Sequence, residues 1–298
     1  MDNKINATVF LTVAETGSFR KAADELGYTQ AGISYIIGAM EEAAGCSLFL
    51  REHGGVKLTS EGELLLPQIQ QLHAWERRFA QTVNELNGLE KGTLRVQIFD
   101  SVSVHWIPKI LREFCRDYPG IKVELFTEEN ARRAEEMVLN GEADCGFFLT
   151  GKVNGLDTIP LIEEHLMAVV SPDHPLANEK HFPISQIEKY PYIRMKYEEA
   201  SPIGQAFREE NITPNVAFTM DNDYAAMAMV SNGLGFCIFP ELLLKNIPYD
   251  LKCLTFDMPK KRTLSVGTRN MKTASKACRK FIEYTCRIVQ AQEGVHPA

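Results

Sequence analysis

The stretch SFRKAADELGYTQAGIS, residues Ser18 to Ser34, decides the fold of the N-terminal part of this chain. Two short runs of good helix formers flank Gly27-Tyr28-Thr29. Gly27 stands where a left-handed residue ends a helix, and Thr29 can cap the helix that follows. A helix, a tight turn with glycine and a second helix form the helix-turn-helix pattern, whose second helix lies in the major groove of DNA. The sequence therefore predicts a corner that aims one helix end at DNA.

The residues around this corner complete a small domain. Apolar residues recur at helical spacing over residues 4–16, and Gly17 ends that predicted helix before Ser18 caps the next one. Beyond the recognition helix, LFLREHGGVKLTSEG has the pattern of two short strands around Gly54-Gly55. We therefore expect a β-hairpin wing whose basic side chains project towards phosphates.

Candidate DNA contacts lie at the start of the recognition helix, at the start of the helix before it and on the wing. A glutamine amide can pair with the adenine edge, hydroxyl groups can bind phosphates or bases, and basic side chains bind phosphates. The candidates are Ser18, Thr29, Gln30, Ser34, Tyr35, Arg51, His53 and Lys57. For the helix-turn-helix stretch alone, an ordinary packed corner with solvated polar residues is the alternative.

A longer series of motifs runs from Phe10 to Gly62. It comprises Phe10, Val13, Ala14 to Phe19, Ala22-Ala23, Leu26, Thr29-Gln30, Ser34, Glu41, Gly45, Leu48-Phe49, Arg51, Leu58-Thr59 and Gly62. In these residues the chain resembles the N-terminal domain of LysR-type transcriptional regulators. The resemblance implies a regulator that binds double-stranded DNA near promoters. The family usually has Pro-Ala where this chain has Ala31-Gly32, and a second wing arginine where it has Gly54.

The charge of the chain limits how it can bind DNA. Its formal net charge is -7, which argues against a large non-specific nucleic-acid binder. Residues 1–60 carry five basic and seven acidic side chains, a net charge of -2. Affinity must then depend on where the few cations lie and on the pairing of two domains.

Residues 61–89 are expected to form a linker and dimerisation helix. Apolar residues recur there in steps of four and three, which is a heptad-like seam. The seam consists of Leu65, Ile69, Leu72, Phe79, Val83 and Leu86. Ser60 and Glu63 have the spacing of a capping box.

An amphipathic helix packed on its own domain is the alternative. The resemblance implies instead that the helix pairs with the same helix of a second copy. Two recognition helices would then meet an inverted repeat, in a homodimer that further assembles into a homotetramer.

After Gly92 short strands alternate with helices, which is typical of an α/β fold with a parallel sheet. The resemblance implies a two-lobed effector domain akin to periplasmic binding proteins. The overall class is therefore α/β, with a winged helix-turn-helix at the N-terminus. The expected divisions are 1–60 for DNA binding, 61–89 for the linker, 92–162 with 266–298 for lobe 1, and 163–265 for lobe 2. The chain would cross between lobes near Ile162 and Ser265.

A small-molecule effector is expected between the lobes, because ligands of α/β sheets bind outside the carboxyl ends of strands. By position in the family, the effector contacts fall on Ser101, Ser103, Asn130, Thr150, Ser201 and Ile203. Helix capping is the alternative role for such residues. The same loops also carry Asp100, Glu128, Glu129, Glu198, Glu199, Asp221 and Asp223. If several of these acids face the cleft, an amine or a neutral polyhydroxyl compound is favoured over an anion.

Other protein classes are disfavoured by what the sequence lacks. MDNKINATVF has no signal-peptide pattern and no apolar stretch approaches the ~20 residues that span a bilayer, so we expect a cytoplasmic protein with no membrane partner. The seven cysteines contain no CxxC, and no catalytic motif or metal-binding spacing occurs, so no cofactor, metal or enzymatic activity is expected. Two alternatives stay open: a redox-responsive regulator of the same family that uses cysteines, and a cytoplasmic solute-binding protein. RNA polymerase is a further candidate partner.

Overall fold

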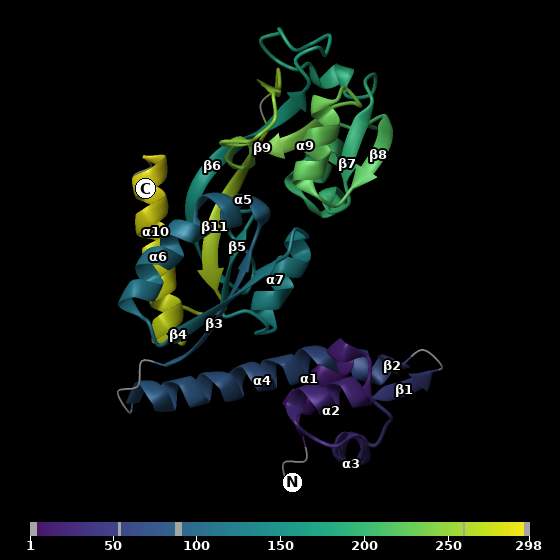
Figure 1. Ribbon diagram of the computed structural model, residues 1–298, viewed down its shortest axis with the longest axis vertical. Coiled ribbons are helices and arrows are strands. Elements are labelled where there is room, and N and C mark those ends of the chain that lie inside the picture. Colours follow the sequence, from purple (N-terminus) through teal and green to yellow (C-terminus); the bar gives the residue numbers. More distant parts are fainter. Residues whose placement is uncertain (1–4, 53–54, 87–90, 259, 295–298) are drawn as a thin grey trace. The chain divides into compact units, whose positions relative to one another are not determined.

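The computed structural model describes residues 5–52, 55–86, 91–258 and 260–294. The chain divides into two compact units. One comprises Met1–Leu89 with Asn140–Glu142, and the other comprises Glu90–Leu139 with Ala143–Ala298 (Figure 1). Among the described residues, no helix has the length and apolarity needed to cross a membrane.

The first unit is a three-helix corner with a two-stranded wing and a long helix. Its elements are α1 (Ala7–Thr16), α2 (Phe19–Leu26), α3 (Gln30–Ala44), β1 (Phe49–Glu52), β2 (Gly55–Leu58) and α4 (Ser60–Leu86). Left-handed glycines end the first three helices, at Gly17, Gly27 and Gly45. Side-chain caps begin α2 at Ser18 and α3 at Thr29, as the sequence predicts. The predicted helix-turn-helix and the wing are therefore confirmed as elements of the fold.

The helices enclose one apolar core. Phe10, Ala22 and Ile33 are each 0% exposed at its centre, and the small Ala22 lets α3 approach α2 closely. Glu41 of α3 connects the helical core with the wing. Its Oε1 accepts a hydrogen bond from Leu48 N at 2.7 Å and one from Phe49 N at 3.2 Å. The helical corner thus fixes where the wing begins.

The start of α4 differs from the sequence prediction. The hydroxyl of Thr59, and not that of Ser60, caps the helix by accepting a hydrogen bond from Gly62 N at 2.9 Å. The Thr59 hydroxyl also donates to Ser47 O at 2.8 Å, whereas Ser60 Oγ donates to Glu61 Oε2. Burial decides between the two neighbouring hydroxyls, since Thr59 is 8% exposed and Ser60 faces solvent.

This difference gives a first prediction. Thr59→Ala should lower the free energy of unfolding of the N-terminal unit by about 1–2 kcal/mol, because it removes a buried helix cap. Ser60→Ala should change it by less than about 0.5 kcal/mol, as a surface substitution does. Urea unfolding of the two variants measures both values, and equal losses would contradict the assignment of the cap to Thr59.

The predicted seam of α4 divides into a buried and an exposed part. Ile69 is buried in the core of its own domain, and Leu65 and Leu72 pack half-buried against it. Further along the helix, Phe79 is 72% exposed and Val83 is also exposed, and the side chain of Leu86 lies outside the described residues. The first half of the seam therefore serves intradomain packing, and the second half leaves an apolar stripe uncovered in this chain.

The second unit is the α/β part. Its first helices and strands are β3 (Gly92–Ile98), α5 (Asp100–His105), α6 (Ile107–Asp117), β4 (Ile121–Thr127), α7 (Ala131–Leu139), β5 (Cys145–Phe148) and β6 (Asp157–Val170). The middle elements are η1 (Ile184–Gln186), β7 (Tyr192–Met195), η2 (Glu198–Ala200), α8 (Pro202–Glu209), β8 (Val216–Met220) and α9 (Asp223–Ser231). The last are β9 (Cys237–Pro240), η3 (Glu241–Leu244), β10 (Lys252–Thr255), β11 (Lys261–Thr268) and α10 (Lys276–Glu293).

The main sheet is mixed, which corrects the expectation of a parallel sheet. Its order is β10-β6-β11-β5-β3-β4, and β9 also pairs with β6. Within this sheet, β3 pairs in parallel with β4 and β5, whereas β11 is antiparallel to both β5 and β6. In a second, two-stranded sheet, β7 and β8 pair in parallel. The antiparallel pairs arise because strands distant in sequence return beside one another, which local alternation does not reveal.

Two long strands join the two halves of this unit. Figure 1 shows β6 and β11 running side by side from the half that contains β3, β4 and β5 to the half that contains β7, β8 and β9. One half encloses a core around Trp106 and Phe281, and the other encloses cores around Tyr192 and Phe239. The pairing of β11 with β6 shifts register between Leu264 and Ser265. The two-lobed α/β architecture predicted from the sequence is thus confirmed.

Candidate functional site

The start of α3 presents exposed polar side chains on the helical corner. Gly27 turns the chain with φ 70°, and Thr29 Oγ1 accepts a hydrogen bond from Gly32 N at 3.1 Å. Gln30 is exposed, Tyr35 is 80% exposed, and Ser34 between them is half-buried. The cap satisfies a backbone N–H group of the first helical turn, and the side chains that face solvent are accessible to a DNA groove.

The wing is fastened to the turn between α1 and α2. Val56 N donates to Gly17 O at 2.8 Å, and a side chain at Gly55 would put its Cβ 2.7 Å from the same oxygen. Arg51 is exposed, and its guanidinium lies 4.8 Å from the centre of the Phe19 ring. The wing therefore holds Arg51 beside the first turn of α2. His53 and Gly54 lie outside the described residues.

A groove lies between the wing and the first turn of α2. Ser18, Lys21 and Lys57 line it together with Glu52. Ser18 Oγ accepts a hydrogen bond from Lys21 N at 3.3 Å, and Lys57 Nζ lies 2.8 Å from Glu52 Oε2 with 72% of its side chain exposed. Lys21 was not among the candidates drawn from sequence; its signal was its position three residues after the cap.

The α/β unit contains a cavity lined from both halves. It has about 420 Å³ of space not filled by atoms, part of it open to solvent. The lining residues are Ser101, Glu129, Leu149, Leu166, Tyr197, Ser201, Pro202, Ile203, Asp223, Pro240, Leu243 and Arg262. The structure thus brings together the predicted residues Ser101, Ser201 and Ile203, which come from α5 and from the start of α8.

The other predicted effector residues form local hydrogen bonds outside this lining. Ser103 Oγ donates to Asp100 O at 2.8 Å, and Asn130 Oδ1 accepts from Arg133 N at 3.1 Å at the start of α7. Thr150 Oγ1 donates to Lys152 O at 3.4 Å. These three residues make the kind of local hydrogen bond that Ser, Thr and Asn often make at helix ends and turns, and their effector contacts stay a prediction.

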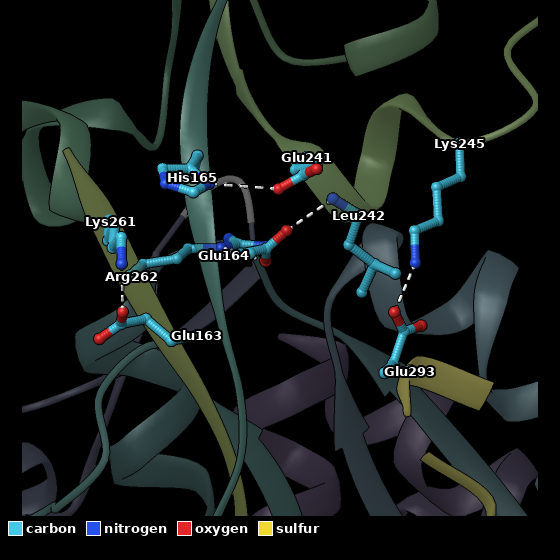
Figure 2. Close-up of polar contacts among 9 residues, drawn as sticks. All are labelled: Glu163, Glu164, His165, Glu241, Leu242, Lys245, Lys261, Arg262 and Glu293. Atoms are coloured by element: carbon cyan, nitrogen blue, oxygen red, sulfur yellow. Dashed lines mark hydrogen bonds and ion pairs between the residues drawn. The ribbon is translucent and has the colours of Figure 1, made fainter. Parts of the chain in front are cut away.

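One lining residue of the cavity, Arg262, belongs to a buried ion pair. Arg262 Nη2 lies 2.7 Å from Glu164 Oε1, and the two side chains are 8% and 4% exposed. Glu164 Oε2 accepts from Leu242 N at 2.6 Å, and Arg262 Nη2 donates to Ser101 Oγ at 3.2 Å. Figure 2 shows how this pair links β6, β11 and the start of η3. Arg262 and Glu164 were missed at the sequence level because both lie within strands and not in loops.

Two carboxyl groups of the cavity have strongly raised pKa values. Burial raises the pKa of Glu129 to about 8, although its Oε1 accepts a hydrogen bond from Asp100 N at 2.7 Å. Burial also raises the pKa of Asp223 to about 6, against the lowering effect of the Tyr197 hydroxyl, which donates to Asp223 Oδ1 at 2.6 Å. The pKa of Asp100 is raised by burial as well. Each of these groups favours its protonated form more than an exposed acid does.

Three other acidic residues of these loops have partners elsewhere. Glu128 Oε1 accepts from Asn130 N at 2.8 Å, and Asp221 pairs with Lys196 at 2.7 Å. Glu198 is buried and accepts a hydrogen bond from the Tyr192 hydroxyl, and burial raises the pKa of Glu198 to about 7. The acidic character of the cavity therefore comes from fewer acids than the loop composition indicates.

These raised pKa values predict how stability depends on pH. The folded chain binds more protons than the unfolded chain between the ordinary carboxyl pKa and about 8, so the free energy of unfolding falls as pH rises. Burial lowers the pKa of His105 and His174, which acts in the opposite sense below about pH 6.5. The effect of the carboxyls is therefore best measured between about pH 6.5 and 8.5, above the range where the histidines oppose it. In that range one such carboxyl lowers the free energy of unfolding by at most ~1.4 kcal/mol per pH unit.

Glu129→Gln tests this dependence, since an amide cannot titrate. Thermal unfolding across the window should show a shallower loss of stability for the variant than for the parent chain. Glu128→Gln, which keeps a neighbouring hydrogen bond of the same loop, should follow the parent. Parallel curves for all three proteins would contradict the burial of the Glu129 carboxyl.

The cysteines bear on the redox alternative. All seven are free thiols, and burial raises the pKa of Cys237 well above its ordinary value. Burial also raises the pKa of Cys253, the other cysteine of that lobe. Because the thiolate is the reactive form, these shifts disfavour both residues as peroxide-reactive groups. Among the described residues, no group of three His, Cys, Asp or Glu side chains could hold a metal ion.

Family models match both units of the chain. A model described as "LysR substrate binding domain" matches residues 87–287, and one described as "Bacterial regulatory helix-turn-helix protein, lysR family" matches residues 6–63. The chain is 28% identical over 287 residues to the uncharacterized HTH-type transcriptional regulator YvbU of Bacillus subtilis (strain 168), and the match covers 95% of this chain and 98% of that relative.

Solved structures share the fold over almost the whole chain. A full-length OxyR variant from Pseudomonas aeruginosa superposes with a TM-score of 0.69 at 19% identity, covering 96% of this chain and 95% of that one. Full-length CbnR, solved with its target DNA, superposes with a TM-score of 0.64 at 21% identity, covering 94% and 98%. At these identities the likeness concerns the fold.

Proposed function

This chain belongs to the LysR family of bacterial transcriptional regulators, and from that premise we propose how it reads DNA and how an effector controls it. It is a DNA-binding transcriptional regulator with a small-molecule effector-binding domain. Because the regulatory role accounts for both units, we propose that the protein is not an enzyme. We also propose that it acts in the cytoplasm.

We propose that the start of α3 enters the major groove. Gln30 pairs with a base edge, and Thr29, Ser34 and Tyr35 contact phosphates or bases beside it. Arg51 and His53 from the wing, with Ser18 and Lys57, bind the flanking backbone, and we add Lys21 to this set. The exposure of Gln30 and Tyr35 and the lining of the groove by Lys21 and Lys57 support this assignment. CbnR, a structural neighbour, has been solved in complex with its target DNA.

The chain is proposed to act as a dimer through α4, and as a tetramer when two dimers associate. The exposed Phe79 and Val83 supply an apolar stripe that a second α4 can cover. Two copies of α3 would then meet an inverted repeat near a promoter. Avidity between them compensates for the small number of basic residues in each domain.

An effector in the cavity is proposed to shift the population of lobe arrangements. Ser101 and Glu129 line the cavity from one half, and Ser201 and Asp223 line it from the other. A ligand that contacts both halves therefore favours the arrangement in which the halves lie closer together. The register shift in the pairing of β11 with β6 supports a bending point between Leu264 and Ser265, near the proposed boundary of lobes 92–162 with 266–298 and 163–265. The change in lobe angle would move the DNA-binding pairs and alter recruitment of RNA polymerase.

The observation that carries the proposal is the match of both units to LysR family models, residues 6–63 and 87–287. A reporter fused to the promoter nearest to the gene tests it in cells. Deleting the gene should change reporter expression, and the parent chain should restore it. A Gln30→Ala chain expressed at the same level should fail to do so. Restoration by that variant equal to restoration by the parent would contradict DNA reading by α3.

A further inference from the structure

The charge balance of the effector cavity indicates which molecules it takes, and this inference rests on the proposed function. Asp100 and Glu129 lie in one half, Asp223 lies in the other, and the three carboxyls act electrostatically on one another. Arg262 is the basic group whose charge reaches both Glu129 and Asp223, but Glu164 already pairs with it. With four carboxyls and one guanidinium, the formal charge of this group is -3 when all of them are ionised.

Several of the hydrogen-bond donors in the cavity lining are already engaged. Arg262 donates to Glu164 and to Ser101 Oγ, and the Tyr197 hydroxyl donates to Asp223. At the start of α8, the N–H groups of Ile203 and Gly204 donate to Ser201 Oγ. A carboxylate effector that used one of these donors would have to displace its present acceptor while entering a negative field, and both effects disfavour it.

We propose that the effector is a small organic cation, a primary amine whose ammonium group binds between Glu129 and Asp223. Its carbon chain contacts the apolar part of the lining, formed by Leu149, Leu166, Ile203, Pro240 and Leu243. An ammonium group has three donors and no acceptor, which matches carboxylates whose acceptor capacity exceeds their present partners. Because Glu129 and Asp223 come from opposite halves, the same cation neutralises their repulsion and favours the closed arrangement of the lobes.

Amine binding should release protons. The pKa of Glu129 is raised to about 8 and that of Asp223 to about 6, so a nearby cation lowers both pKa values and releases protons from these carboxyls. The groups that face this pair are Asp100 on α5, Tyr197 after β7, Cys237 on β9 and Arg262 on β11. Among them, Asp100 raises both carboxyl pKa values and Arg262 lowers both, and neither removes the proton linkage. Affinity for the amine should therefore rise with pH towards about pH 8.

The test uses the full-length chain and matched probes. Primary amines, amino alcohols and diamines are compared with carboxylates and alcohols of the same carbon skeleton, at equal ionic strength and millimolar concentration. Thermal unfolding should show stabilisation by members of the amine class and none by their carboxylate counterparts.

Calorimetry of the amine that stabilises most, in buffers of different ionisation enthalpy, should show proton release. Glu129→Gln and Asp223→Asn should each weaken binding about tenfold or more, and Glu128→Gln should leave it unchanged.

Three outcomes would overturn the proposal: stabilisation by carboxylates equal to that by amines, no stabilisation by any amine, or an equal response to magnesium chloride. The proposed function is judged separately, by DNA footprints made with and without a metabolite extract. If the extract alters the footprint while the amines do not bind, the proposed function is supported and the proposal of an amine effector is contradicted. If neither the extract nor any probe alters DNA binding, effector control itself fails.

Discussion

Glu164→Ala is expected to lower the free energy of unfolding of the effector domain by about 3–5 kcal/mol, because it leaves a buried charge without its partner. The substitution removes both carboxylate oxygens, one of which binds Arg262 and the other Leu242 N. Arg262, with a side chain 8% exposed, would keep only Ser101 Oγ at 3.2 Å among the partners described above, and Leu242 N would lose its acceptor.

The chain offers a matched control one residue away. Glu163 pairs with Lys261 at 2.7 Å, but the two side chains are 58% and 46% exposed (Figure 2). Glu163→Ala should therefore cost less than about 1 kcal/mol. Urea unfolding followed by tryptophan fluorescence measures both, in a Trp75→Phe background so that the buried Trp106 reports on the effector domain. Equal losses in the two variants would contradict the role given to Glu164.

Gln30→Ala is expected to weaken binding to the natural DNA site by roughly thirtyfold or more, because a good bidentate base contact contributes about 1–3 kcal/mol and a dimer makes two. The loss should be specific. Affinity for scrambled DNA should change little, since phosphate contacts carry most non-specific binding. Fluorescence anisotropy with both DNA sequences, at a stated salt concentration, gives the two values.

Two further variants separate base reading from phosphate binding. Lys57→Ala should weaken binding to both DNA sequences alike and reduce the dependence on salt, as removal of a phosphate contact does. Gln205→Ala removes an exposed glutamine from α8 and should leave both affinities unchanged. If Gln30→Ala weakened the natural and scrambled sites equally, Gln30 would be a phosphate contact and not a reader of bases.

The helical corner was predictable because its signals are local. Gly17, Gly27 and Gly45 end helices through their own backbone freedom, and Ser18 and Thr29 cap helices within three residues. The start of α4 was misassigned because a tertiary contact with Ser47 selects Thr59 over its neighbour. The antiparallel strands were missed for a related reason, since β11 pairs with β5 and β6 across a long separation in sequence.

The effector cavity was only partly predictable. The positions of the strand ends predicted that the loops with Ser101, Ser201 and Ile203 lie close together, and these residues line one cavity. Whether a polar side chain faces the cavity or bonds to its own backbone segment depends on rotamers that sequence does not set, as Ser103 and Asn130 illustrate. Arg262 reaches the cavity from inside a strand, where alternation indicates a face but not a partner.

The most direct test of the account is a footprint of the purified chain on the intergenic DNA beside its own gene. We predict protection of an interrupted inverted repeat at moderate salt, and its loss in Gln30→Ala with retention in Gln205→Ala. Absence of protection from the parent chain, both alone and with metabolite pools added, would contradict the claim that this protein reads DNA through α3.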